Sequence, residues 1–96
     1  SGIGKEEEKI RPQLGIILDA EYEGGGAKVF EVINGSIADI AGVLAGDVVM
    51  IVDGDDISNA DEMVLKIKDT RLGAKINFSI RRDRVEELVK AELIFE

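Results

Sequence analysis

The segment from Asn34 to Gly54 constrains the fold more than any other part of the chain. The pair Asn34-Gly35 predicts a turn, and Ser36 is placed to cap a short helix over residues 37–41. A second turn then leads into an apolar run at 48–52, which predicts a buried strand. A short helix therefore has to pack close to a sheet within a small mixed α and β domain.

Apolar runs and alternating patterns predict the other strands. Residues 27–33 carry apolar side chains on both faces, which predicts a strand covered on both sides. Residues 85–95 also alternate, and helical spacing fits part of this stretch, but a strand that pairs with residues 74–81 is the preferred interpretation. The expected strands are 14–18, 27–33, 48–52, 76–81 and 85–95.

One longer helix is predicted between residues 60 and 70. Ser58 or Asn59 can cap its first turn, and Asn59 with Glu62 has the spacing of a capping box. The apolar side chains recur at helical intervals and give the helix one apolar face of about three turns; they are Ala60, Met63, Val64 and Ile67.

A chain of 96 residues provides one domain, with 45% hydrophobic but only 4% aromatic residues. The core is therefore expected to be aliphatic, with Phe30, Phe78 and Phe95 as its large side chains. Residues 1–10 are predicted to be a charged linker or an expression remnant, and residues 11–96 the domain. No apolar run reaches the roughly 18 residues that a membrane span needs.

Charge and composition exclude several functions. The chain has 20 acidic and 12 basic residues and a net charge of −8, which disfavours nucleic acid as a partner. Without histidine or cysteine it cannot assemble a Ser-His-Asp triad or a His/Cys zinc site. A calcium loop that began at Asp53 would place Ser58 and Val64 where glycine and glutamate are required. No catalytic residue, metal or cofactor is therefore predicted.

Two adjacent motifs carry a resemblance to a known family. Residues 35–43 read G-S-x-A-x-x-A-G-Φ, and residues 44–54 read Φ-x-x-G-D-x-Φ-x-x-Φ-(N/D)-G, where Φ is apolar. Together they resemble PDZ domains, over about residues 11 to 96. The resemblance implies an α+β fold, namely a small, partly open β-barrel or sandwich of five to six strands with one short and one long helix.

The resemblance also implies a site. The residues Gln13-Leu14-Gly15-Ile16 match the x-Φ-G-Φ turn, whose backbone N–H groups bind the terminal carboxylate of a peptide that adds as a strand. The implied function is a non-catalytic module that captures the C-terminal peptide of another protein or of its own parent. The candidate contacts are Leu14, Gly15, Ile16, Ile17, Leu18, Ala60, Met63, Val64 and Ile67.

Two further features refine this expectation. Many family members begin the long helix with a histidine that binds a ligand Ser or Thr, but the matching position here is Ala60, so an apolar ligand residue is expected there. The strand order resembles the circularly permuted domains of HtrA-like and other bacterial envelope proteases, which implies the periplasm or cell envelope. A structural domain whose groove is filled by its own parent protein would share these features.

Overall fold

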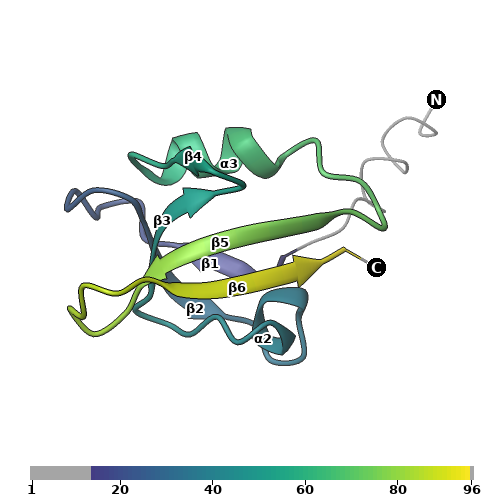
Figure 1. The fold of residues 1–96 in the computed structure, drawn as a ribbon, viewed down its shortest axis with the longest axis horizontal. Helices are drawn as coiled ribbons and strands as arrows, with labels where there is room; N and C mark the ends of the chain where they lie inside the picture. Colours follow the sequence, from purple (N-terminus) through teal and green to yellow (C-terminus); the bar gives the residue numbers. More distant parts are fainter. Residues whose placement is uncertain (1–13, 96) are drawn as a thin grey trace.

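The computed structural model of the protein describes residues 14–95. Within this range the chain forms six strands and two helices (Figure 1). They are β1 (Ile16–Leu18), β2 (Ala27–Val32), α2 (Ile37–Ile40), β3 (Val48–Val52), β4 (Asp55–Asp56), α3 (Ala60–Ile67), β5 (Lys75–Arg81) and β6 (Val89–Ile94). The predicted linker at residues 1–10 and the motif residue Gln13 lie outside the described residues.

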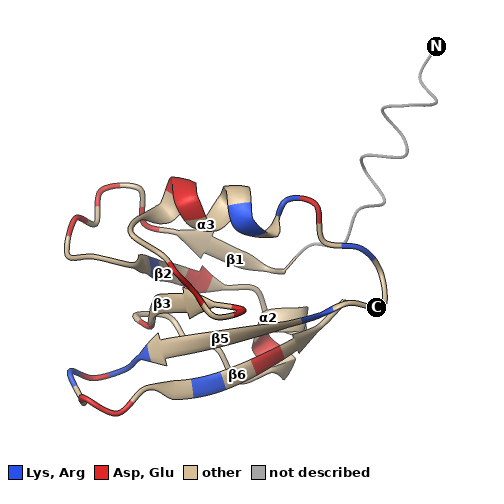
Figure 2. Cartoon of the chain, turned by 45° about the horizontal axis from the view of Figure 1, so that its top comes forward, with Lys and Arg blue, Asp and Glu red and all other residues tan. Residues whose placement is uncertain are grey.

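The strands form one open antiparallel sheet in the order β1-β2-β3-β5-β6, with β4 paired to β3. Within the described chain β1 pairs with β2 alone, so its other side is a sheet edge. Figure 2 shows α3 beside this edge, and both figures show α2 beside β6, at the other end of the sheet. The predicted α+β class and strand number are confirmed.

The core is aliphatic, as the composition predicts, and its largest buried side chains include Phe78, Phe95 and Met63. Phe30 was expected to join them, and that prediction is wrong, because its side chain is 65% exposed. The cause is a bulge: Ile17 pairs with Glu31 and Leu18 with Val29, so Phe30 has no partner on β1 and points outward. The expectation that β2 is covered on both faces fails for the same reason.

Both helices begin at the predicted caps. Ser36 Oγ accepts the Asp39 N–H at 3.2 Å, and Asn59 Oδ1 accepts the Glu62 N–H at 2.9 Å. The Glu62 carboxylate accepts the Ser58 N–H at 3.1 Å, which completes a capping arrangement one residue earlier than predicted. The bonds from Asp39 and Glu62 satisfy amides that the first helical turn leaves without a backbone partner, and the Ser58 bond satisfies an amide just before α3.

The last segment is a strand, as preferred, but it begins at Val89 instead of residue 85. Ile80 of β5 pairs with Val89 of β6, and β5 ends one residue later at Arg81. Residues 85–88 therefore have no strand opposite them and form part of the connection. Alternation alone did not reveal this, because it continues into the loop.

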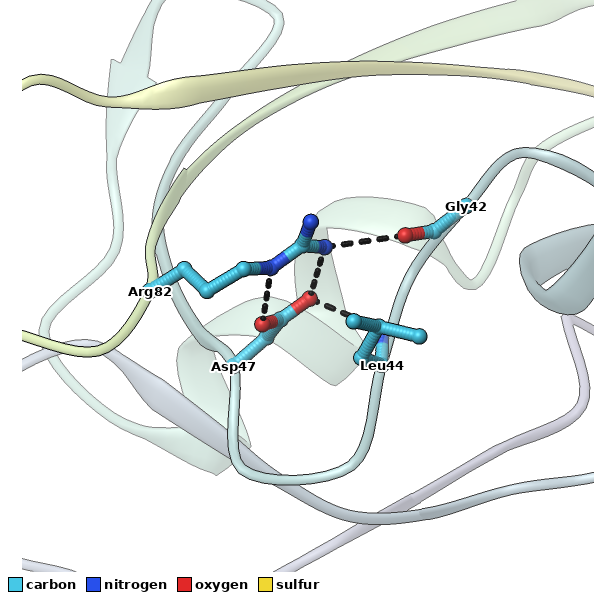
Figure 3. A network of polar contacts seen from close by, with 4 residues as sticks. All are labelled: Gly42, Leu44, Asp47 and Arg82. Atoms are coloured by element: carbon cyan, nitrogen blue, oxygen red, sulfur yellow. Dashed lines mark hydrogen bonds and ion pairs between the residues drawn. The ribbon is translucent and has the colours of Figure 1, made fainter.

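An ion pair between buried Asp47 and half-buried Arg82 joins the turn before β3 to the end of β5 (Figure 3). Asp47 is 1% exposed, and its carboxylate accepts Arg82 Nε at 2.8 Å, Arg82 Nη2 at 2.7 Å and the Leu44 N–H at 2.8 Å. Arg82 Nη2 also donates to the Gly42 carbonyl at 2.9 Å. The hydrogen bond to Asp47 raises the pKa of Arg82.

Candidate functional site

A groove of about 400 Å³ lies between β1 and α3. Its walls are apolar apart from one lysine near the C-terminal end of α3. The groove is lined by Leu14, Gly15, Ile16, Leu18, Ile33, Met63, Val64, Ile67, Lys68 and Phe95. Seven of the nine residues predicted for the site therefore meet around one cavity.

The strand wall follows from β-strand alternation. Ile16 and Leu18 are half-buried and line the groove, whereas Ile17 is 45% exposed and does not line it. Successive side chains of a strand point to opposite faces, so three consecutive residues cannot all face one cavity. Ile17 was predicted as part of the strand edge that pairs with a ligand, and that contact stays a prediction.

The main chain of β1 is oriented by its bonds to β2. The Gly15 carbonyl accepts the Ile33 N–H at 2.8 Å, and the Asp19 N–H donates to the Lys28 carbonyl at 2.9 Å. Both residues thus direct backbone groups toward β2. Because these groups alternate along an antiparallel strand, the N–H and C=O of Ile16 and Leu18 point toward the open edge and the groove.

Three residues of α3 form the opposite wall. Met63 is fully buried and belongs to both the core and the groove, while Val64 is 51% exposed at the rim and Ile67 is half-buried. The spacing of these residues keeps them on one side of the helix. Ala60 is half-buried one turn earlier and does not line the cavity.

Three lining residues were not among the sequence candidates, namely Ile33, Lys68 and Phe95. Lys68 follows Val64 by four residues, so helical spacing could have identified it. Ile33 and Phe95 come from chain segments far from both β1 and α3 in sequence. Only the pairing of β1 with β2, and the return of β6 beside β5, places them here.

A turn at Gly15 closes one end of the groove. Gly15 has φ +81°, and a Cβ atom there would overlap the side chain of Ser36. The Leu14 carbonyl accepts the Ala38 N–H at 2.9 Å, which ties this turn to α2. The motif at residues 35–43 therefore supports the site directly, because its small residues let α2 sit against the Gly15 turn.

The groove can bind but offers little for catalysis. Lys68 is the one ionisable side chain among its lining residues. In the described part of the chain, His, Cys, Asp and Glu nowhere form a group of three suited to a metal ion. None of the described helices is long and apolar enough to cross a membrane.

Comparisons with known proteins agree with this architecture. The sequence model of the PDZ domain matches residues 12–93. A search of curated proteins found no match. One similar solved structure is the HtrA-type protease AlgW with a decapeptide, at 25% identity and a TM-score of 0.73, over 90% of this chain and 30% of that chain.

Two other structures share the fold. A serine-to-alanine variant of AlgW with a decapeptide has 24% identity and a TM-score of 0.78, over 98% of this chain and 31% of that chain. An aminopeptidase N family protein from Idiomarina loihiensis has 22% identity and a TM-score of 0.73, over 90% of this chain and 14% of that chain. The chain thus spans a third or less of each of these three structures. With the fold, the groove and the match over residues 12–93 in agreement, the chain belongs to the PDZ domain family.

Proposed function

We propose that this domain captures the C-terminal end of an extended polypeptide, which adds to the sheet beside β1. The observation that carries the proposal is an apolar groove bounded by an open strand edge and closed at one end by the Gly15 turn. PDZ domains are non-catalytic modules, so the site acts by binding.

The ligand lies antiparallel to β1 in this proposal. Its main chain pairs with the outward N–H and C=O groups of Ile16 and Leu18, which provides affinity that does not depend on ligand sequence. Its terminal carboxylate meets the N–H groups of Leu14, Gly15 and Ile16 at the turn, with Lys68 as the nearby cation. The cavity then receives the terminal apolar side chain between Leu14, Ile16 and Ile67.

Two similar structures, both of AlgW, were solved with a decapeptide, which supports a peptide as the ligand class. Since this chain matches about a third of AlgW, we place it in a larger bacterial protein of the cell envelope or periplasm, such as a serine protease. There it recruits substrates or senses them. A short peptide on one strand edge is expected to bind with micromolar affinity, about −8 kcal/mol or weaker.

The absence of histidine from the chain bears on ligand choice. Ala60, at the start of α3, offers no side-chain donor for a ligand Ser or Thr. We therefore expect an apolar residue two positions before the ligand C-terminus. A peptide-library screen that selected Ser or Thr there would contradict this preference.

The proposal is tested by NMR titration of the labelled domain with a C-terminal peptide library, each peptide with a free carboxylate or an amidated end. We expect amide shifts at residues 14–18 and along α3 that are lost on amidation. Equal binding of both forms would refute carboxylate capture. Absence of shifts for every peptide would instead favour a domain whose groove is filled by its own parent protein.

A further inference from the structure

A second cavity lies on the opposite face of the sheet from the core, at the start of β2 and β3 and the end of β5. It measures about 320 Å³ and is lined by Tyr22, Lys28, Gly46, Val48, Arg81, Asp83 and Arg84. Lys28 pairs with Val48, and Val48 pairs with Arg81, so these three residues form one row across β2, β3 and β5. The row places a cation on each side of an apolar floor.

Tyr22, from the loop between β1 and β2, contacts both cations. Arg81 Nη2 donates to the Tyr22 hydroxyl at 2.7 Å, and Lys28 Nζ lies 5.4 Å from the centre of the Tyr22 ring. A guanidinium has five N–H donors, so Arg81 keeps most of its donors for a ligand. Lys28 and Arg81 therefore both contact Tyr22 although a strand separates them.

The third cation comes from a strained turn. Asp83 and Arg84 have φ of 53° and 61°, and the Val85 N–H donates to the Arg82 carbonyl at 3.1 Å. This is the pattern of a type I′ turn, where glycine is strongly preferred at the position that Arg84 occupies. Residues held in costly backbone conformations cluster at functional sites. Here that side chain lines the cavity.

The side chains that line this cavity carry unequal numbers of positive and negative charges. Three cations and one carboxylate line it, which leaves an excess of two positive charges on a chain of net charge −8. Among residues 14–95, no ion pair involves Lys28, Arg81 or Arg84. An anionic ligand of charge near −2 would neutralise the cavity.

We propose that this second cavity binds a phosphate group, either as a free ion or on a phosphorylated side chain of a partner protein. Phosphate monoesters carry a charge of about −1.5 to −2 at neutral pH and accept several hydrogen bonds, which matches the excess charge and the donors of Lys28, Arg81 and Arg84. Guanidinium groups suit such oxyanions because they donate paired N–H groups in one plane. The site is independent of the β1–α3 groove.

The test is an NMR titration of the domain with inorganic phosphate, with acetate as the monoanionic reference, at constant ionic strength. We expect saturable shifts at Tyr22, Val48 and residues 81–84 for phosphate and much weaker ones for acetate. Lys28→Gln and Arg81→Gln should each weaken phosphate binding by about tenfold. Lys75→Gln, which removes an exposed cation at the other end of β5, should leave it unchanged.

Arg84→Gly separates binding from folding. Glycine relieves the positive φ, so the urea midpoint should rise while phosphate affinity falls by about tenfold. A capped, amidated peptide that contains phosphoserine is the second ligand: tighter binding than free phosphate identifies a phosphorylated partner, and equal binding identifies the free ion. The proposal is overturned if shifts do not saturate, if acetate binds as well as phosphate, or if Arg84→Gly leaves affinity unchanged.

Discussion

Gly15 combines a backbone conformation that favours glycine with contact to a neighbouring side chain. Its φ is +81°, and a Cβ atom would overlap Ser36, which itself caps α2. The turn that we propose for carboxylate binding thus depends on one missing side chain. Other glycines with positive φ do not share this contact. Gly25 has φ +87° and open space where its Cβ would lie.

The comparison of these two glycines gives a prediction. Gly15→Ala should destabilise the fold by about 2 kcal/mol, since it adds a clash to the left-handed backbone cost, and should weaken peptide binding at least tenfold. Gly25→Ala should carry only the backbone cost of about 1 kcal/mol and leave the peptide affinity intact. Urea unfolding and peptide titration of both variants measure these effects. Similar losses of peptide affinity would refute the special role of Gly15.

Asp47 holds two turns together through its bonds to Arg82 and Leu44. Asp47→Ala leaves the Arg82 guanidinium without its partner, and we expect a loss of about 3 kcal/mol in unfolding free energy. Asp69→Ala removes an exposed carboxylate and should change stability by less than about 0.5 kcal/mol. Chemical denaturation measures the unfolding free energy of both variants. Equal losses would show that the ion pair with Arg82 does not stabilise the fold.

At the scale of elements, α3 has one side in the groove and another in solvent. Val64 lines the groove and is 51% exposed, whereas Leu65 is 63% exposed and lies outside it. Neither side chain belongs to the core, so both positions accept substitution without loss of the fold. Substitutions at these two adjacent residues can therefore separate an effect on ligand binding from an effect on helix stability.

Val64→Asp should weaken binding of a C-terminal peptide by about tenfold or more, because it places a charge against an apolar ligand surface. Leu65→Asp makes the same change on the solvent side and should leave affinity within about twofold. Both should unfold at nearly the same urea concentration as the original chain. If Leu65→Asp weakened binding as much as Val64→Asp, the ligand would not occupy the groove between β1 and α3.

At the scale of the molecule, the net charge of −8 is spread unevenly. A ligand antiparallel to β1 leaves the groove beyond Leu18, toward a loop that carries Asp19, Glu21 and Glu23. Figure 2 shows acidic residues along this loop. The basic cavity at Tyr22 and Arg81 lies on the outer face of the sheet. The groove exit instead faces the three carboxylates of this loop and is acidic.

We therefore expect peptides with two lysines upstream of the terminal residues to bind more tightly than peptides with two glutamates there. The difference should shrink as salt is raised, because the screening length falls from about 10 Å at 0.1 M to about 3 Å at 1 M. Titrations of both peptides at low and high salt measure it. An affinity difference that salt does not change would exclude this electrostatic contribution.

The sequence alone determined the fold class and the order of the elements. Local signals were sufficient because they act within a few residues: Ser36 and Asn59 cap their own helices, and the motifs of residues 35–54 identify the family. The same motifs pointed to the Gly15 turn and to seven residues that line the groove. The caps depend on turn chemistry within one segment, whereas the Gly15 turn and the groove residues were implied by the resemblance to the family.

Only the tertiary structure decided which side chains from different segments lie together. A bulge between β1 and β2 turned Phe30 out of the core, and pairing between distant segments brought Ile33 and Phe95 to the groove. The row that joins Lys28 to Arg81 exists only because β3 lies between β2 and β5 in a particular register. Strand register is set by contacts across the whole sheet, so the pattern within one segment does not predict it.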